Sequence, residues 1–450
     1  METLIKMKFL LPTVQQAFPS AISCEPLASP IVQANAEGQL VSVSFDNVGT
    51  PIKTCFVKTV DAHQYNEKKA WPDLRRTLMY LRTEVRFYEE ILPDLVTTMG
   101  AEGTGVSTPE IFAAGYDLDG LLTEEERATD DPTKGPLDVN WSSSCSSNTS
   151  NDIRKKKGGY IVMEAISDAE YMQDSPITIA QAKEALETIA TFHASAWENT
   201  SLLEKAQDRL SKGSYHLKTR NPKEVAGLPD AWTHFSTAFG IEDDGDENLG
   251  KRIQDLAEYI CEETSPDPTA KYATLSHGDC KAMNCFLPIH KDGQTNDGAA
   301  HRGAILVDFA STGVGLGMSD VAMLINHAVR PQHLEDGGEA MLIDHYLDVL
   351  NRKLSFSKKV HQTSKAGEDK QLEHLYPREV ALWHYKLAAA DYFRFFLGRF
   401  WKTATPETFE KKKDSKNTAL INRDRDAAIR FLGRAKTFIS EIETRRNETV

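Results

Sequence analysis

Two carboxylates and one amide in the second half of the chain have the spacing that phosphoryl transfer from ATP requires. Asp279 and Asn284 lie five positions apart in the segment LSHGDCKAMNCFL, and Asp308 ends a second apolar run in the segment ILVDF. A carboxylate can accept the proton of an attacking hydroxyl, while an amide and a second carboxylate can hold Mg²⁺. The pattern therefore predicts Asp279 as the catalytic base and Asn284 and Asp308 as metal ligands.

Asp308 carries a further expectation because it follows apolar residues. A carboxylate buried at the end of a strand needs a cation or several hydrogen-bond donors, since an unpaired buried charge is costly. Mg²⁺ that bridges the phosphates of ATP would meet that need. Asp279 and Asn284 alone form a common pattern, and they become specific because Asp308 follows Asn284 by 24 residues.

The form H-G-D-x4-N followed by [I/V]-D-F resembles the aminoglycoside phosphotransferase and choline kinase superfamily. Within it, the chain is most similar to the ecdysteroid kinase-like (CHK kinase-like) family. The resemblance implies ATP and Mg²⁺ as cofactors and a small-molecule alcohol as substrate. The sequence reads Asp308-Phe309-Ala310 rather than D-F-G, and His277-Gly278-Asp279 rather than H-R-D. Both departures argue against a protein kinase.

The resemblance also implies nucleotide-binding residues in the first half of the chain. Lys58 lies on a predicted strand and would contact the phosphates of ATP. Glu84 follows it by 26 residues on a predicted helix, a spacing that suits the Lys–Glu pair of kinases. Met163 and Glu164 would end the strand that leads to the hinge, where backbone groups hold adenine.

One expected motif is missing, and its absence leaves other functions open. A glycine-rich phosphate loop would precede the first hairpin, yet residues 22–45 contain only Gly38. A catalytically weak pseudokinase or ligand-binding scaffold is therefore an alternative. A metal-dependent hydrolase that uses His277, Asp279 and Asp308 is another, although it lacks the usual ligand spacing.

Composition limits the partners and the compartment. The 450 residues carry 52 basic and 66 acidic side chains, a net charge of −14, which argues against nucleic acid as a partner. Six cysteines do not form a disulfide framework, and we interpret Cys280 and Cys285 as buried thiols. No apolar run is long enough to span a membrane. The first residues resemble a signal peptide only until Pro12, so we expect a cytoplasmic protein.

The first half of the chain predicts a sheet with one helix. Alternating residues at 40–45 and 54–60 indicate a hairpin, and further strands are expected at 110–117 and 159–166. A helix is expected at 75–92, with Pro93 as its end. The polar segment 119–157, between two of the strands, is predicted to be a disordered insertion.

The second half predicts mainly helices. Thr178 and Gln181 form a capping box before a helix whose buried face includes His193, a core histidine with one paired nitrogen. A strand pair, Asn284–Leu287 and Ala304–Phe309, surrounds the motif. Asp320 is interpreted first as a helix N-cap. Further helices are expected at 252–262, 320–329, 339–352 and 377–401.

The resemblance assigns two of these residues a supporting role: Asp320 would brace the catalytic loop, and His277 would be structural. Together the elements predict an α+β, two-lobed protein-kinase-like fold. The small β-rich lobe would span 1–165 and the larger, mostly helical lobe 166–450. The aromatic residues of 377–401 are interpreted as core, and an aromatic pocket for a sterol or a quaternary ammonium is the alternative. Neither the phosphate acceptor nor the oligomeric state can be inferred from the sequence.

Overall fold

The chain folds into two compact units. The computed structural model describes residues 2–32, 35–46, 52–66, 68–98, 106–122, 157–210, 216–217, 222–241, 248–290, 303–362 and 375–449. Unit 1 comprises Met1–Pro93, Thr108–Asp168 and Arg209–Ser211, and unit 2 comprises Asp94–Ser107, Ala169–Asp208 and Lys212–Val450. The predicted insertion at 119–157 lies outside the described residues from 123 to 156.

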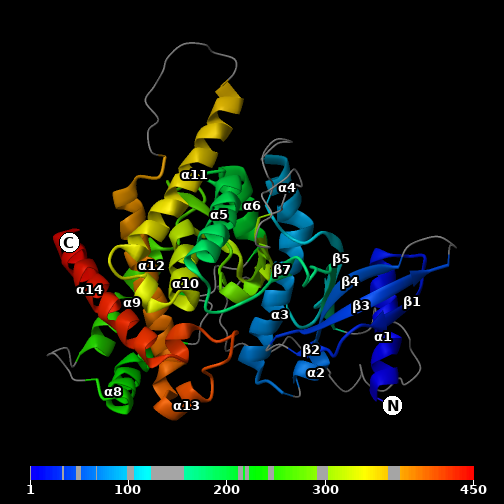
Figure 1. The fold of residues 1–450 in the computed structure, drawn as a ribbon, viewed down its shortest axis with the longest axis horizontal. Helices are drawn as coiled ribbons and strands as arrows, with labels where there is room; N and C mark the ends of the chain where they lie inside the picture. Colours follow the sequence, from blue (N-terminus) through cyan, green and yellow to red (C-terminus); the bar gives the residue numbers. More distant parts are fainter. Residues whose placement is uncertain are drawn as a thin grey trace. The chain divides into compact units, whose positions relative to one another are not determined.

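Unit 1 is built on one antiparallel sheet with the strand order β1-β3-β4-β6-β5, and β2 pairs with β3 (Figure 1). The strands are β1 (Ala21–Pro26), β2 (Ile31–Val32), β3 (Glu37–Phe45), β4 (Lys53–Asp61), β5 (Ile111–Asp117) and β6 (Gly158–Glu164). The predicted hairpin is confirmed as β3 and β4, and the two further strands as β5 and β6. The sequence did not predict β1, β2 or the helix α1 (Glu2–Ala17).

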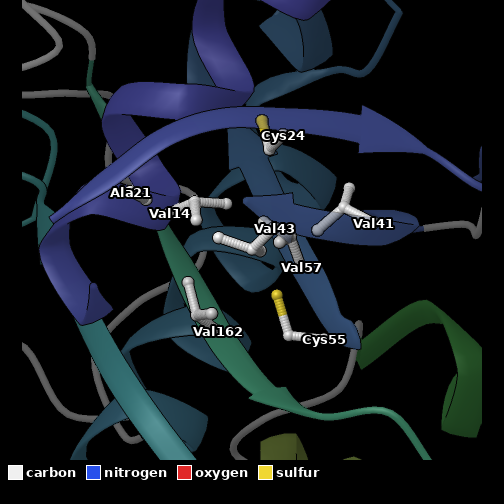
Figure 2. Packing of buried hydrophobic residues seen from close by; sticks show 8 residues of the cluster. All are labelled: Val14, Ala21, Cys24, Val41, Val43, Cys55, Val57 and Val162. Atoms are coloured by element: carbon white, nitrogen blue, oxygen red, sulfur yellow. The ribbon is translucent and has the colours of Figure 1, made fainter. Parts of the chain in front are cut away.

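The two faces of this sheet bury different kinds of residue. One face forms an apolar cluster with Val14 of α1, and its members are Val14, Ala21, Cys24, Val41, Val43, Cys55, Val57 and Val162 (Figure 2). Successive residues of a strand face opposite sides, so Val57 enters this cluster and Lys58 points to the other face. Glu84 of α3 (Trp71–Arg86) meets Lys58 there. The alternation along β4 therefore places α1 and α3 on opposite faces.

The helix that carries Glu84 is longer and less regular than predicted. Its apolar stripe is buried as expected, with Leu78 at 0% and Val85 at 4% exposure. After α3 the chain makes a π-helical turn, Phe87–Ile91, and continues as α4 (Leu92–Thr98). The prediction that Pro93 ends the helix is therefore wrong. The π turn ends at Ile91, two residues before Pro93, which lacks the N–H that would continue an α-helical hydrogen-bond ladder.

Unit 2 is mostly helical. Its predicted helices are confirmed as α5 (Ile179–Ala196), α9 (Leu249–Glu263), α10 (Gly317–Ala328), α11 (Gly338–Gln362) and α12 (Arg378–Arg399). The others are α6 (Thr200–Arg209), α7 (Pro222–Ala226), α8 (Leu228–Phe239), α13 (Pro406–Glu410) and α14 (Arg425–Thr449), with 3₁₀ turns at Pro331–His333, Trp401–Thr403 and Leu420–Asn422. The capping box at the start of α5 is present, because Thr178 accepts from the N–H of Gln181 and donates its own N–H to that side chain.

Packing in unit 2 confirms the core interpretation of the aromatic residues in α12. Helix α12 packs against α10 and α14, and α5 packs against α11. The buried aromatic residues of α12 are Tyr385, Tyr392, Phe393, Phe395 and Phe396. Trp383 and His384 of the same helix are only half-buried, so the core interpretation holds for these five aromatic residues and not for the whole set.

Short strands in unit 2 frame the motif. Strand β8 (Ala273–Ser276) pairs with β11 (Gly313–Leu316), and β9 (Cys285–Pro288) pairs with β10 (Ile305–Leu306) and β7 (Tyr171–Met172). The predicted strand pair around the motif is thus confirmed, although β10 is shorter than expected. A β-rich unit 1 and a mostly helical unit 2 confirm the predicted α+β fold.

Candidate active site

The loop after β8 holds Asp279 in a shape that glycine makes possible. The loop begins where β8 ends at Ser276, and Gly278 has a φ of +78°, a left-handed conformation that favours glycine. A Cβ atom at Gly278 would lie 2.1 Å from the backbone oxygen of Ser311. The loop therefore passes close to the 3₁₀ turn Phe309–Ser311, which follows directly after Asp308.

Asp320 fixes this loop through its backbone. Its Oδ2 accepts from the N–H of His277 at 2.6 Å and its Oδ1 from the N–H of Gly278 at 3.0 Å. The N-cap interpretation of Asp320 is wrong, because α10 begins at Gly317 and Asp320 lies within its first turn. The bracing role that the family resemblance implied is confirmed, since the carboxylate serves the loop rather than its own helix.

The charge of Asp320 is stable although its side chain is fully buried. Burial by itself would raise the pKa of this carboxyl. The hydrogen bond and charge of His193, with the hydrogen bond from the Gly278 amide, outweigh burial and hold the pKa below its ordinary value. We therefore expect Asp320 to be ionised at neutral pH.

Both histidines near the loop have structural partners. His277 Nε2 lies 3.0 Å from the oxygen of Val307, and its Nδ1 accepts from the N–H of Asp279 at 3.3 Å. A carbonyl only accepts and an amide only donates, so His277 is neutral with its proton on Nε2. His193 Nε2 lies 3.0 Å from Asp320 Oδ2, and its Nδ1 lies 2.7 Å from the Tyr346 hydroxyl. His193 is thus a core residue as predicted, but both of its nitrogens are paired, not one.

Asp279 and Asn284 meet directly, as their spacing predicts. The Asn284 amide nitrogen donates to the Asp279 backbone oxygen at 2.8 Å and to Asp279 Oδ2 at 3.1 Å. Lys281 Nζ also lies 2.8 Å from Asp279 Oδ2. The Asp279 side chain keeps 30% exposure, so it remains accessible to a substrate. Lys281 was missed in the sequence, although a lysine two positions after the aspartate is close enough along the chain to contact it.

Asp308 lies beside this loop, in a conformation that the sequence does not predict. The N–H of Val307 donates to the backbone oxygen of Asn284 at 3.0 Å, and the Val307 backbone oxygen lies 3.0 Å from His277 Nε2. Asp308 follows with φ 67° and ψ 59°, a left-handed conformation that aspartate tolerates better than most residues. The expectation of a buried strand-end carboxylate is wrong: β10 ends at Leu306, and Asp308 is only half-buried.

The residues present fit a hard divalent cation. The Asn284 amide nitrogen is occupied by Asp279, which leaves its oxygen as the atom available to a metal. Amide and carboxylate oxygens are the ligands that Mg²⁺ prefers. Within the described ranges, no group of three or more His, Cys, Asp and Glu side chains forms a metal-binding set. Cys280 and Cys285 are buried thiols as predicted, and burial raises the pKa of Cys285 to about 12.

In unit 1, Lys58 and Glu84 form the pair that their spacing suggests. Lys58 Nζ lies 2.6 Å from Glu84 Oε2, with side-chain exposures of 12% and 2%. Lys58 lies in the middle of the sheet, opposite Gly38 of β3 and Ile161 of β6. A central strand and a buried helix face therefore hold the two charges together.

Met163 and Glu164 lie at the end of β6. Met163 is 5% exposed and pairs with Phe56 and Ile111 in the sheet. Glu164 Oε2 accepts from the N–H of Glu110 at 3.0 Å. Residues 165–167 follow in no regular element, so β6 ends two residues before its predicted bound.

The structure thus places the predicted residues in two groups. Asp279, Asn284 and Asp308 belong to adjoining loops of unit 2, while the Lys58–Glu84 pair and the end of β6 belong to unit 1. In the part of the chain that the structure describes, no helix is both long and apolar enough to cross a membrane.

Comparisons with known proteins give a family and several similar structures. The model of the ecdysteroid kinase-like family matches residues 53–359. Choline kinase LicA from Streptococcus pneumoniae is 12% identical with a TM-score of 0.36, covering 86% of this chain and 98% of that chain. A choline/ethanolamine kinase family protein from Mesorhizobium loti is 9% identical with a TM-score of 0.37, covering 96% and 95%.

Amicoumacin kinase hAmiN, in complex with AMP-PNP, Ca²⁺ and Ami, is 10% identical with a TM-score of 0.37, covering 98% of this chain and 96% of that chain. These TM-scores are low, so the family assignment rests on the sequence match. No curated protein matches the chain in sequence.

Proposed function

Because the chain belongs to the ecdysteroid kinase-like family, we propose that it is an ATP- and Mg²⁺-dependent kinase that phosphorylates a hydroxyl of a small molecule. The observation that carries this proposal is the loop of unit 2. There an accessible carboxylate, Asp279, is held next to Asn284, and the turn that carries Asp308 adjoins both. This is the set of groups that a kinase needs around the transferred phosphoryl group.

Each of these side chains has a separate task in the proposed reaction. Asp279 accepts the proton of the substrate hydroxyl as that oxygen bonds to the γ-phosphorus and the bond to ADP breaks. Asn284 and Asp308 would supply oxygen ligands to Mg²⁺. Bound Mg²⁺ would neutralise charge on the phosphates of ATP. Lys281 Nζ lies 2.8 Å from Asp279 Oδ2 and adds a positive charge beside this carboxylate.

The proposed nucleotide contacts lie in unit 1. Lys58 would bind the phosphates of ATP, with Glu84 holding its ammonium in place through their 2.6 Å contact. The end of β6, at Met163 and Glu164, would offer backbone groups to adenine. Met163 is buried in the sheet, so its backbone rather than its side chain would make that contact.

The test measures ADP formation by the purified full-length chain. The acceptor panel is choline, ethanolamine, kanamycin, myo-inositol and an ecdysteroid, each with and without Mg²⁺. We expect acceptor-dependent ADP formation that requires Mg²⁺. Asp308→Ala should abolish the Mg²⁺ dependence of ATP binding in titration calorimetry, because it removes a proposed metal ligand. If the wild type forms no ADP with any acceptor, or if the variant keeps the Mg²⁺ dependence, the proposal fails.

A pseudokinase or ligand-binding scaffold of the same fold is the second candidate, and one observation favours it. The segment between β1 and β3 contains no glycine before Gly38. Gly38 itself lies within β3, where a Cβ atom would meet the Phe56 ring at 2.3 Å. It is therefore committed to sheet packing rather than to a phosphate loop. ATP binding without ADP formation would support this second candidate.

A further inference from the structure

Lys281 is fixed between the proposed base and a proposed metal ligand. Its N–H donates to the Asp279 backbone oxygen at 2.8 Å, and its own backbone oxygen accepts from the N–H of Asn284 at 2.8 Å. Cys280 and Ala282, on either side of it, are both 1% exposed. The Lys281 side chain is 27% exposed, so of these three consecutive residues it is the one that reaches the accessible side of the loop.

The ammonium of Lys281 and the Asn284 amide share one oxygen of the proposed base. Lys281 Nζ lies 2.8 Å from Asp279 Oδ2, and Asn284 Nδ2 donates to the same atom at 3.1 Å. A substrate hydroxyl would therefore meet the other oxygen, Oδ1. Because a general base works at hydrogen-bond distance, the hydroxyl and the ammonium would lie on the two oxygens of one carboxylate. The phosphoryl group that bonds to this hydroxyl would then come close to the ammonium.

The position of Lys281 also suits the charge that develops in phosphoryl transfer. Negative charge spreads over the oxygens of the transferred group, and a positioned cation stabilises that transition state. In protein kinases a glycine-rich loop covers the phosphates, but residues 22–45 of this chain contain only Gly38. Lys281 would supply positive charge from the catalytic loop instead.

We propose that Lys281 is a catalytic residue that hydrogen-bonds an oxygen of the transferred γ-phosphoryl group. This inference rests on the proposed function and adds a phosphate-binding residue to it. An ammonium has three N–H donors, so it can keep its contact with Asp279 while it donates to a phosphoryl oxygen. The substrate oxygen bonds to phosphorus, the bond from phosphorus to ADP breaks, and the hydroxyl proton passes to Asp279. Lys281 keeps its own proton throughout.

An ordinary surface ion pair is the alternative, and the chain offers a matched example. Lys157 Nζ lies 2.7 Å from Asp117 Oδ1, with side-chain exposures of 30% and 34%. Lys281 and Asp279 have nearly the same exposures, 27% and 30%, at a distance of 2.8 Å. The two pairs should therefore contribute equally to stability, and a difference between them in turnover can be assigned to the reaction.

The main variant is Lys281→Met in the full-length chain, and Lys157→Met is its control. Turnover and KM are measured with the most active acceptor of the panel named above. Lys281→Met should lower kcat about 10²-fold, the effect of removing one donor to a developing charge. KM for ATP and for the acceptor should stay within about twofold of wild type, since the contact is made mainly in the transition state. Lys281→Arg should recover part of kcat, because it keeps the positive charge in a different shape. Lys157→Met should leave kcat unchanged, and both methionine variants should shift the thermal unfolding midpoint by a similar small amount.

A second comparison separates contact with the phosphoryl group from an effect through Asp279. If Lys281 only orients Asp279, the double variant Asp279→Asn with Lys281→Met should keep the residual turnover of Asp279→Asn alone. Direct contact with the phosphoryl group should lower that residual turnover by a further tenfold or more, on the order of the loss expected for one donor. Transfer of labelled γ-phosphate to the acceptor measures these low rates.

Two results would overturn this inference while the wild type is active: turnover of Lys281→Met within about threefold of wild type, or a double variant no slower than Asp279→Asn. The first would make the contact an ordinary ion pair, and the second would make Lys281 a positioning residue. A wild type that forms no ADP with any acceptor is a different result, because it removes the proposed function and this inference together.

Discussion

Both units bury a carboxylate, but they hold it in different ways. In unit 1, Glu84 pairs with the ammonium of Lys58, the end of a flexible side chain. In unit 2, Asp320 accepts from two consecutive backbone amides and from the His193 ring. The first contact can change when a side chain moves, whereas the second can change only if the loop itself changes shape.

This difference separates residues that act from residues that support. The backbone-held carboxylate fixes the loop, and a neighbouring carboxylate, Asp279, stays 30% exposed on the same loop. We therefore expect changes at Asp320 to appear mainly in stability and changes at Asp279 mainly in turnover. Lys58 and Glu84 should lie between these extremes.

The largest effect is expected at the exposed carboxylate. Asp279→Asn should lower turnover by about 10² to 10⁴-fold, because the substrate hydroxyl loses its proton acceptor. ATP binding and the free energy of unfolding should change little, since the side chain is partly exposed and Asn284 can still bond to the backbone oxygen of residue 279. Steady-state ADP formation, titration calorimetry and urea denaturation measure the three quantities.

Asp344→Asn is the control for that experiment. Asp344 is 43% exposed and pairs with Arg378 outside the loop, so its loss should leave turnover unchanged. If Asp279→Asn keeps turnover within about threefold of wild type, Asp279 is not the base. The proposed division between Asp279 as an acting residue and Asp320 as a supporting residue is then wrong.

Asp320→Ala should give the largest loss of stability. It leaves two buried amides and the His193 ring without their acceptor, and each unpaired group costs about 1–3 kcal/mol. We expect the free energy of unfolding to fall on the order of 3 kcal/mol or more, measured by urea denaturation. Asp344→Ala removes an exposed ion pair and should cost about 0–1 kcal/mol. Similar losses in the two variants would refute the bracing role.

The pH dependence of stability gives an independent check on Asp320. Its pKa is lower in the folded chain than in the unfolded chain, so the unfolded state binds the proton more readily. The stabilisation is present above the unfolded pKa of about 4 and is lost as the pH falls through the lower folded pKa. Wild-type stability should therefore decrease below about pH 4, and Asp320→Asn should show a shallower decrease.

Local patterns in the sequence predicted the elements that local forces determine. The β3–β4 hairpin follows from alternation, and the start of α5 follows from the side chains of Thr178 and Gln181. The contact between Asp279 and Asn284 follows from five residues of spacing. In each case the interacting residues are close in sequence, or one pattern repeats along the element.

The remaining features depend on contacts between residues far apart in the sequence. Asp320 accepts a hydrogen bond from the N–H of His277, 43 residues away. The sequence indicated a cap on its own helix instead, because only neighbouring residues can be compared there. The left-handed Asp308 directly follows Val307, whose backbone is held by Asn284 and by His277, 23 and 30 residues away. No local pattern carries this information.

A smaller effect is expected where the loop of unit 2 passes close to the backbone of Ser311. Gly278→Ala puts a Cβ on a residue with φ +78° and brings it 2.1 Å from the Ser311 oxygen. Gly240→Ala is matched, because Gly240 has φ +58° but open space around its Cβ position. The control should lose about 1–2 kcal/mol from the left-handed conformation alone, and Gly278→Ala should lose about 1 kcal/mol more. Equal losses in urea denaturation would mean that the loop has room to move.

The smallest effect is expected in unit 1, where a double-mutant cycle can measure the Lys58–Glu84 pair. Lys58→Met, Glu84→Gln and the double variant should give a coupling free energy of about 1 kcal/mol, because side chains that are 12% and 2% exposed are poorly screened by water. Lys157 and Asp117 form a matched pair in the same unit at 2.7 Å, with exposures of 30% and 34%. Their coupling should be smaller, about 0.2–0.5 kcal/mol.

Lys58→Met should also raise the ATP KM, whereas Lys157→Met should not. If the two couplings are equal and the ATP KM is unchanged, the Lys58–Glu84 pair is an ordinary ion pair. Unit 1 then has no functional residues comparable with those on the loop of unit 2.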